Sequence, residues 1–195
     1  MRWMRLVPQV ICATCFVASA VLWSCTPTAK QEPPAAAGTT PEQKLAHGKY
    51  MVTVLGCGDC HTPGAFYGAP DTTRTLAGSE LGWKGPWGIS FARNLTPDST
   101  GIGAWSEEQI VVAIREGRRP DGSPLLPPMP WTDFAHLTDD DAQAVAAYLK
   151  SIPAVKHVNV ATVPPGKKYA GGYLAFPPPP AWDLPPQVGE KPAAK

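Results

Sequence analysis

Two thiols and an imidazole lie within the five residues Cys57-Gly58-Asp59-Cys60-His61. Side chains of these types bind a structural zinc ion, exchange a disulfide bond or attach a cofactor covalently. Structural zinc needs four ligands, and the other histidines, which we expect at the surface, stand at no zinc-finger spacing: His47, His136 and His157. A thioredoxin-like thiol pair lies between a strand and a helix, whereas this motif follows a predicted helix and strand patterns are absent. Zinc and thiol chemistry are therefore the weaker alternatives.

The C-x-x-C-H pattern is the attachment signature of haem c. The thiols of Cys57 and Cys60 can add to the two vinyl groups of one porphyrin, and His61 is then placed to ligate the iron. The opposite face of the iron needs a second ligand, and a Met/His pair is typical of electron-transfer cytochromes. We predict Met129 in this role, because prolines on both sides fix its backbone. Met51 is expected to pack in the core.

Three helices must position these residues, and each has a capping residue at its predicted start: Thr40, Ser106 and Thr138. A glutamine three residues later completes a capping box in the first two helices. Gly117 and Pro153 are the predicted ends of the second and third helices. Residues 62–104, rich in glycine, tryptophan and proline, are expected to be irregular and to wrap around a bound group.

The chain divides into four predicted parts. Residues 1–24 are interpreted as a signal peptide, 25–40 as a flexible tether, 41–153 as an all-α domain and 154–195 as a proline-rich, extended tail. The predicted helices offer little apolar surface for a domain of this size, which indicates that a bound cofactor helps to stabilise the fold. A net charge of +1 without a basic stripe indicates no nucleic-acid partner.

The N-terminal residues predict export, because a positive start precedes an apolar run. The sequence Leu-Trp-Ser before Cys25 resembles a lipobox, so we predict that Cys25 is lipidated and anchors the protein to a bacterial membrane on the periplasmic side. Cleavage there removes Cys12 and Cys15 and leaves no spare thiol, as suits an oxidising compartment. Cleavage after Ala20, at an A-x-A signal, and an uncleaved anchor helix are the open alternatives.

Four stretches lie within residues 44–153: GKYMVTVLGCGDCHTPGA, FARNLTPDSTGIGAWSEEQIVVAIREGRRPDG, LLPPMPW and LTDDDAQAVAAYLKSIP. They resemble the class I c-type cytochromes, in particular the monohaem bacterial domains related to cytochrome c subunits of periplasmic alcohol and aldehyde dehydrogenases. The resemblance implies an all-α, cytochrome c-like fold in which the first and last helices cross around one haem. Gly48 would allow their close approach, with Tyr148 and Leu149 packed there.

By the same resemblance, Cys57 and Cys60 bind one haem c covalently, with His61 proximal and Met129 distal on the iron. Such a protein carries one electron at a time from a periplasmic dehydrogenase to an oxidase or another cytochrome. It is not an independent enzyme, because both axial positions are filled. Dehydrogenase subunits of this kind often carry three haem motifs, and this chain has one. The alternative function is a ligand-binding sensor or a peroxidase-like haem protein with a labile sixth ligand.

Further residues are candidates for supporting a haem. Arg93 and Asn94 could reach the propionates, whose burial needs a cation or hydrogen bonds. The alternative is a turn held by Asn94, with Arg93 solvated. The carbonyl of Pro70 is a candidate acceptor for the second ring nitrogen of His61. Arginines near the end of the second helix either dock an acidic partner or form a solvated helix end: Arg115, Arg118 and Arg119.

Overall fold

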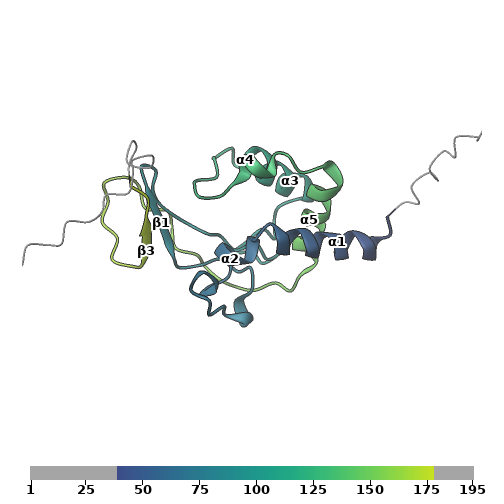
Figure 1. The fold of residues 1–195 in the computed structure, drawn as a ribbon, viewed down its shortest axis with the longest axis horizontal. Helices are drawn as coiled ribbons and strands as arrows, with labels where there is room; N and C mark the ends of the chain where they lie inside the picture. Colours follow the sequence, from purple (N-terminus) through teal and green to yellow (C-terminus); the bar gives the residue numbers. More distant parts are fainter. Residues whose placement is uncertain (1–38, 178–195) are drawn as a thin grey trace, which may run out of the picture. The chain divides into compact units, whose positions relative to one another are not determined.

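The computed structural model describes residues 39–177 of the chain. The predicted signal peptide, Cys25, almost all of the predicted tether and residues 178–195 of the tail lie outside the described residues. Within this range the α-helices are α1 (Pro41–Val54), α2 (Cys57–His61), α3 (Glu107–Glu116), α4 (Trp131–Phe134) and α5 (Asp139–Ser151) (Figure 1). Single 3-10 turns lie at Ala65–Tyr67 and Thr72–Arg74. None of the helices in this range has the length and apolar content needed to cross a bilayer.

Side-chain caps start the three longer helices, as the sequence predicts. At α1 the Thr40 hydroxyl accepts a hydrogen bond from the Gln43 amide at 3.2 Å, and the Gln43 side chain accepts from the Thr40 amide at 2.9 Å. Ser106 and Gln109 form the same reciprocal pair at α3. Thr138 caps α5. These bonds satisfy amide groups that have no partner within a helix, so each start is determined by residues close in sequence.

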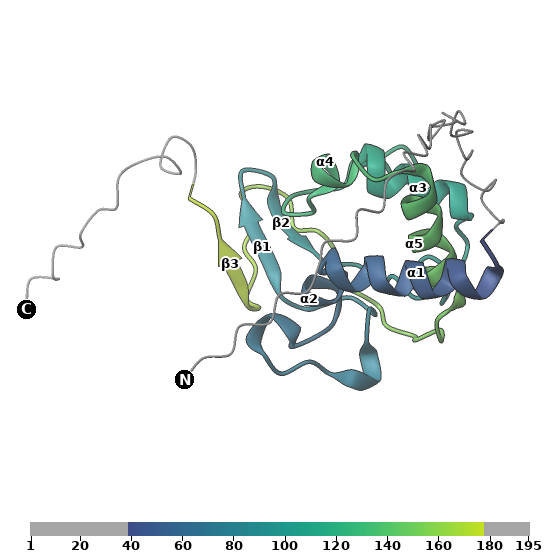
Figure 2. The same cartoon turned by 45° about the vertical axis from the view of Figure 1, so that its right-hand side comes forward.

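The hydrophobic core lies between α1, α3 and α5, and α5 runs beside α1 (Figure 2). Gly48 is buried at the contact of α1 with α5. A Cβ atom on Gly48 would overlap the carbonyl oxygen of Ala144 and would lie 2.7 Å from the Cβ of Tyr148. The two helix backbones therefore approach closely where only glycine fits. The buried core residues come from both helices and from the segments between them: Val52, Leu76, Ile102, Ile110, Val145, Ala146 and Leu149.

The expectation of an all-α fold is wrong in one respect, because the described residues also form a small sheet. Strands β1 (Gly82–Gly85) and β2 (Gly88–Phe91) pair antiparallel, and β3 (Tyr173–Ala175) pairs parallel with β1. The hairpin turns at residues 86–87, and Gly88, which begins β2 after the turn, has a φ of 95° that glycine readily adopts. All four residues of β2 are buried, the polar Ser90 included, and a strand of only four residues gives a weak periodic signal in the sequence.

The chain beyond α5 returns along the fold in an extended conformation. The Val155 amide donates to the Thr96 hydroxyl at 3.0 Å. Further along, Val163 and Ile89 exchange backbone hydrogen bonds at 2.8 and 2.9 Å. Strand β3 then adds to the sheet. Contacts within the folded part thus continue beyond residue 153 as far as β3.

Candidate functional site

The two thiols of the motif lie on one short helix that α1 leads into. Gly56, with a φ of 65°, separates α1 from α2, and α2 carries Cys57, Cys60 and His61 in little more than one turn. Positions three apart lie on the same side of a helix, so both thiols face the same way. Cys57 packs against the hydrophobic core, both thiols are half-buried, and they do not form a disulfide with each other.

Burial determines the chemistry of these thiols. It raises the pKa of Cys57 to about 11, and it raises the pKa of Cys60 with a smaller contribution from the charge of Asp59. A redox-active dithiol needs the opposite, a pKa lowered by cations or a helix N-terminus, because the thiolate is the reactive form. The environment therefore disfavours the thiol oxidoreductase alternative and suits two thiols held side by side for covalent attachment of another group.

The imidazole of His61 is oriented by a backbone carbonyl. Its Nδ1 lies 2.6 Å from the carbonyl oxygen of Arg93. Because a carbonyl only accepts, Nδ1 carries the proton and Nε2 keeps its lone pair for a metal ion. Burial lowers the pKa of His61, against the opposing effect of this hydrogen bond. The neutral, ligating form of the imidazole is thus favoured.

The acceptor for His61 is not the carbonyl of Pro70, so that candidate from the sequence is wrong. Pro70 is exposed in the loop between the two 3-10 turns. The chain leaving β2 passes beside α2 instead, and it brings the carbonyl of Arg93 to the ring. This proximity depends on how β2 packs against the motif, and the spacing of residues along the chain does not reveal it.

Met129 lies in a loop with several attachments to the fold, which we call the methionine loop (residues 118–130). The Leu125 amide donates to the carbonyl of Gly117 at 2.7 Å. The Ser90 hydroxyl of β2 donates to the carbonyl of Pro127 at 2.5 Å. These bonds restrain the backbone on the N-terminal side of Met129, whose side chain is half-buried.

Strand β2 therefore supports both predicted ligand regions. Ser90 holds the methionine loop, and Arg93, two residues beyond the strand, holds the ring of His61. Sequence reasoning missed Ser90, because a serine in a short buried strand carries no signal of the distant carbonyl that it will bind. It also missed the structural use of the Arg93 carbonyl, although the residue itself was a candidate.

Asn94 matches the turn alternative and not the propionate prediction. Its side chain is 1% exposed, and its oxygen accepts from the amide and hydroxyl of Thr96 at 2.9 and 2.8 Å. Its amide group donates to the Val155 carbonyl at 2.8 Å and to the Thr100 hydroxyl at 3.1 Å. All four hydrogen-bonding positions of the asparagine are engaged, so none is left for a further anion.

The side chain of Arg93 is half-buried against the returning C-terminal segment. Its guanidinium donates to the Val160 carbonyl at 3.0 Å and to the Thr162 hydroxyl at 3.2 Å. Burial lowers the pKa of Arg93, and the charge of Arg119 adds to that effect. Two of the five guanidinium N–H donors are used in these bonds, so Arg93 keeps donors for an anion.

Two of the other histidines, His47 and His157, form hydrogen bonds away from the motif. His47 lies 2.7 Å from a carboxylate oxygen of Asp141 and is exposed, as expected. The sequence predicts His157 at the surface, but its side chain is only 13% exposed. It lies 2.7 Å from the carbonyl of Ala77 and 3.0 Å from the carboxylate of Glu80.

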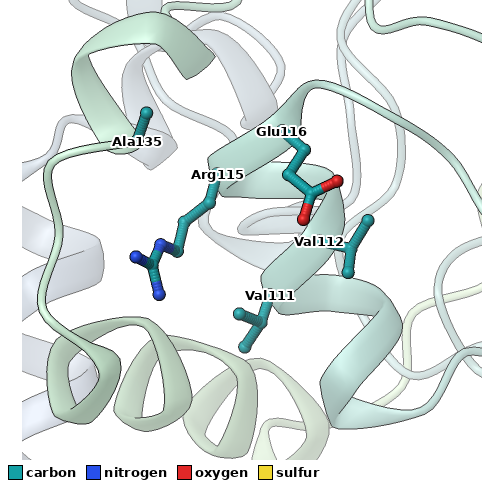
Figure 3. A pocket seen from close by; sticks show the side chains of 5 residues that line it. All are labelled: Val111, Val112, Arg115, Glu116 and Ala135. Atoms are coloured by element: carbon teal, nitrogen blue, oxygen red, sulfur yellow. The ribbon is translucent and has the colours of Figure 1, made fainter.

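A groove between α3 and α4 is separate from the motif. It is lined by Val111, Val112, Arg115, Glu116 and Ala135 (Figure 3). The Arg115 guanidinium donates to the carboxylate of Asp139 at 2.5 Å. Arg115 is thus half-buried in the last turn of α3 and forms an ion pair with α5.

The donor set on α2 meets the needs of the covalently bound group that the motif predicts. Two adjacent neutral thiols suit thioether bonds, and an imidazole with Nε2 free suits one axial position of an iron ion. A thioether on a restrained loop is available in Met129. The residues present therefore fit a haem c.

Known proteins resemble this chain over most of the part that the structure describes. The cytochrome c family model matches residues 45–153. Similar proteins include the cytochrome c subunit of alcohol dehydrogenase (quinone) from Gluconobacter oxydans, 37% identical over 55% of this chain and 21% of that subunit. The fructose dehydrogenase cytochrome subunit from Gluconobacter japonicus is 35% identical over 54% of this chain and 20% of that subunit. The gluconate 2-dehydrogenase cytochrome c subunit from Pantoea cypripedii is 34% identical over 56% of this chain and 26% of that subunit. The matched region is thus about a quarter or less of each relative's length.

Proposed function

The chain belongs to the cytochrome c family, and on that premise we propose that it carries one electron at a time through a single haem c. Membership in this family implies covalently bound haem c and a role in electron transfer rather than independent catalysis. One haem follows from the single C-x-x-C-H motif in the sequence. The observation that carries the proposal is the hydrogen bond from His61 to the Arg93 carbonyl, because it leaves Nε2 free within the attachment motif.

In this proposal Cys57 and Cys60 form the thioether bonds, His61 is the proximal ligand and Met129 is the distal ligand. Bound haem supplies the redox chemistry, since its iron accepts and releases one electron. Met129 raises the reduction potential in comparison with a second nitrogen ligand. Arg93, with its remaining N–H donors, is the proposed cation for a propionate.

The fold contributes rigidity around the two proposed ligands. The close contact of α1 with α5 at Gly48 supports the crossing of the first and last helices that we propose for this domain. The bond from Ser90 of β2 restrains the backbone before Met129, and the carbonyl of Arg93, just beyond β2, restrains the ring of His61. Ligands restrained in this way would need little rearrangement when an electron is added or removed.

We propose that the donor is a dehydrogenase and the acceptor an oxidase or another cytochrome. The support is the similarity to cytochrome subunits of alcohol and fructose dehydrogenases.

We further propose that the protein is exported to the periplasmic side and is anchored by lipid at Cys25. A Cys25→Ser variant should then be recovered in the soluble fraction of lysed cells. Continued retention in the membrane fraction would favour the uncleaved anchor helix.

Covalent haem is tested first, on a denaturing gel stained for haem peroxidase activity. The full chain should retain the stain, and a Cys57→Ala, Cys60→Ala double variant should lose it. Absence of stain from the full chain, expressed with cytochrome c maturation proteins, would refute the proposal. It would also remove the sensor and peroxidase-like alternatives, which need the same group.

The distal ligand is tested by Met129→Ala, with Met51→Ala as the matched control. Met51 is a half-buried methionine packed against the core, so its loss should lower stability without changing the iron ligands. Met129→Ala should lower the reduction potential and allow rapid carbon monoxide binding to the reduced protein. Rapid carbon monoxide binding by the parent protein would instead favour the sensor alternative.

A further inference from the structure

We propose that Asn159 is a positioning residue for His61, acting through the peptide unit between Arg93 and Asn94. The inference rests on the proposed function, in which His61 is the proximal ligand. Asn159 lies beyond α5, outside the region that the family model matches. It belongs to the segment of residues 154–163, here called the C-terminal strap, that packs back onto the chain after β2.

The geometry is a chain of three hydrogen bonds through one peptide unit. The carbonyl of Arg93 accepts from Nδ1 of His61 at 2.6 Å. The amide of Asn94, on the other side of the same peptide bond, donates to Oδ1 of Asn159 at 2.5 Å. Nδ2 of Asn159 in turn donates to the carbonyl of Ala77 at 3.2 Å. The peptide unit that orients the histidine is therefore held from behind by Asn159.

Asn159 is held in place by its surroundings. A Cβ atom on Gly78 would overlap Nδ2 of Asn159 and would lie 2.7 Å from its Cγ, so the side chain fills space that only glycine leaves open. The strap is also attached beside it, because the Arg93 guanidinium donates to Val160 and Thr162. These contacts fix the position of the Oδ1 acceptor relative to the Asn94 amide.

The chemical consequence follows from polarisation along hydrogen-bonded chains. Accepting the Asn94 N–H draws electron density toward the carbonyl oxygen of the same peptide unit, which strengthens that oxygen as an acceptor. A stronger acceptor at Nδ1 makes the imidazole more electron-rich at Nε2. An electron-rich ligand favours the oxidised iron, so Asn159 should lower the reduction potential of the protein. Asn159 thus adds a determinant of the potential beyond the identity of the axial ligands.

The test is a spectroelectrochemical titration of the full, haem-loaded chain. Asn159→Leu removes the acceptor while retaining the bulk, and Asn159→Asp keeps an oxygen opposite the Asn94 amide. Val158→Ala is the matched control, because that neighbouring side chain is 76% exposed. At a fixed ambient potential we expect Asn159→Leu to increase the ratio of reduced to oxidised protein at least threefold. A threefold change in this ratio corresponds to a rise of about 28 mV in the reduction potential, because a tenfold change in a one-electron couple is about 59 mV.

A second measurement separates positioning from general packing. The Nδ1 proton of His61 should exchange with solvent faster in Asn159→Leu than in the parent or in Val158→Ala, as followed by NMR of the reduced protein. Asn159→Asp should show a potential no higher than that of the parent. A merely structural role would instead move the Leu and Asp variants in the same direction, and that result would overturn the inference.

An unchanged potential in Asn159→Leu would also overturn it, while covalent haem in the same sample would leave the proposed function standing. If Asn159→Leu does not load haem, Asn159→Ala is measured in the same way and decides the question by the same criterion. A parent chain without covalent haem would refute the proposed function, and this inference with it.

Discussion

Gly48→Ala should destabilise the protein, although alanine is ordinarily the better helix residue. The replacement gains about 1 kcal/mol of helix propensity. Against this, the new methyl group would overlap the carbonyl oxygen of Ala144, and it would lie 2.7 Å from the Cβ of Tyr148, where ordinary contact begins at 3.4 Å. Neither neighbouring atom can move by rotating a side chain, so the helices must separate. Overpacking of this kind costs about 3 kcal/mol at the upper end of its usual range.

The expected net loss is about 2 kcal/mol, which lowers Tm by roughly 4–8 °C for a chain of this size. Thermal and denaturant unfolding of the haem-loaded protein, followed by far-ultraviolet circular dichroism, measures it. Gly172→Ala is the matched control, because a Cβ there meets nothing within 4 Å. It should change stability by no more than about 0.5 kcal/mol. A Gly48→Ala variant as stable as this control would show that α1 and α5 do not approach as described.

Three further predictions concern a helix cap, an acid-sensitive turn and the methionine loop. Ser106→Ala should lower the free energy of unfolding by about 1 kcal/mol, seen as a lower denaturant midpoint, since its hydroxyl caps α3; an unchanged midpoint would contradict this. Hydrogen bonds, led by that from the Thr73 side chain, lower the pKa of Asp71 to about 2 from an ordinary 3.8. The ionised carboxylate therefore stabilises the folded state above pH 3.8, and this stabilisation is lost as the pH falls toward 2. Asp71→Asn should therefore flatten the acid unfolding curve in that window, and a curve as steep as the parent's would argue against it. Gly117 has a φ of 66°, and a Cβ atom there would lie 2.5 Å from the Trp131 ring. Gly117→Ala should therefore displace the methionine loop and speed carbon monoxide binding to the reduced protein. Unchanged binding kinetics would show that the loop does not depend on this contact.

The shared support from β2 gives the proposed ligands a structural connection. Ser90 holds the methionine loop from within the strand, and the chain just after the strand holds His61. A change in the hairpin would therefore be transmitted to both sides of the proposed iron site. Part of the stretch that the sequence predicts to be irregular, residues 62–104, therefore forms a hairpin whose strand β2 is buried and holds the methionine loop through Ser90.

Several features of this protein depend on residues that are close in sequence, and these could be predicted. Capping boxes extend over four residues, so Thr40 and Ser106 mark helix starts without reference to the rest of the chain. The attachment motif occupies five residues, and its chemistry follows from two thiols and an imidazole at fixed spacing. The family model matched to residues 45–153 confirms the family that this motif predicts.

Other features were decided only by the tertiary structure. The acceptor for His61, the serine behind the methionine loop and the pairing of β3 with β1 all join segments that are far apart in the chain. A backbone carbonyl is present at every residue, so no residue type marks the one that will meet an imidazole. Asn159 shows the same limit: an amide side chain in a proline-rich tail carries no signal of a partner, and its place behind the Arg93–Asn94 peptide depends on the path of the returning chain. Local capping interactions determine where the helices begin, whereas the packing of the helices against the hairpin determines which polar groups form hydrogen bonds.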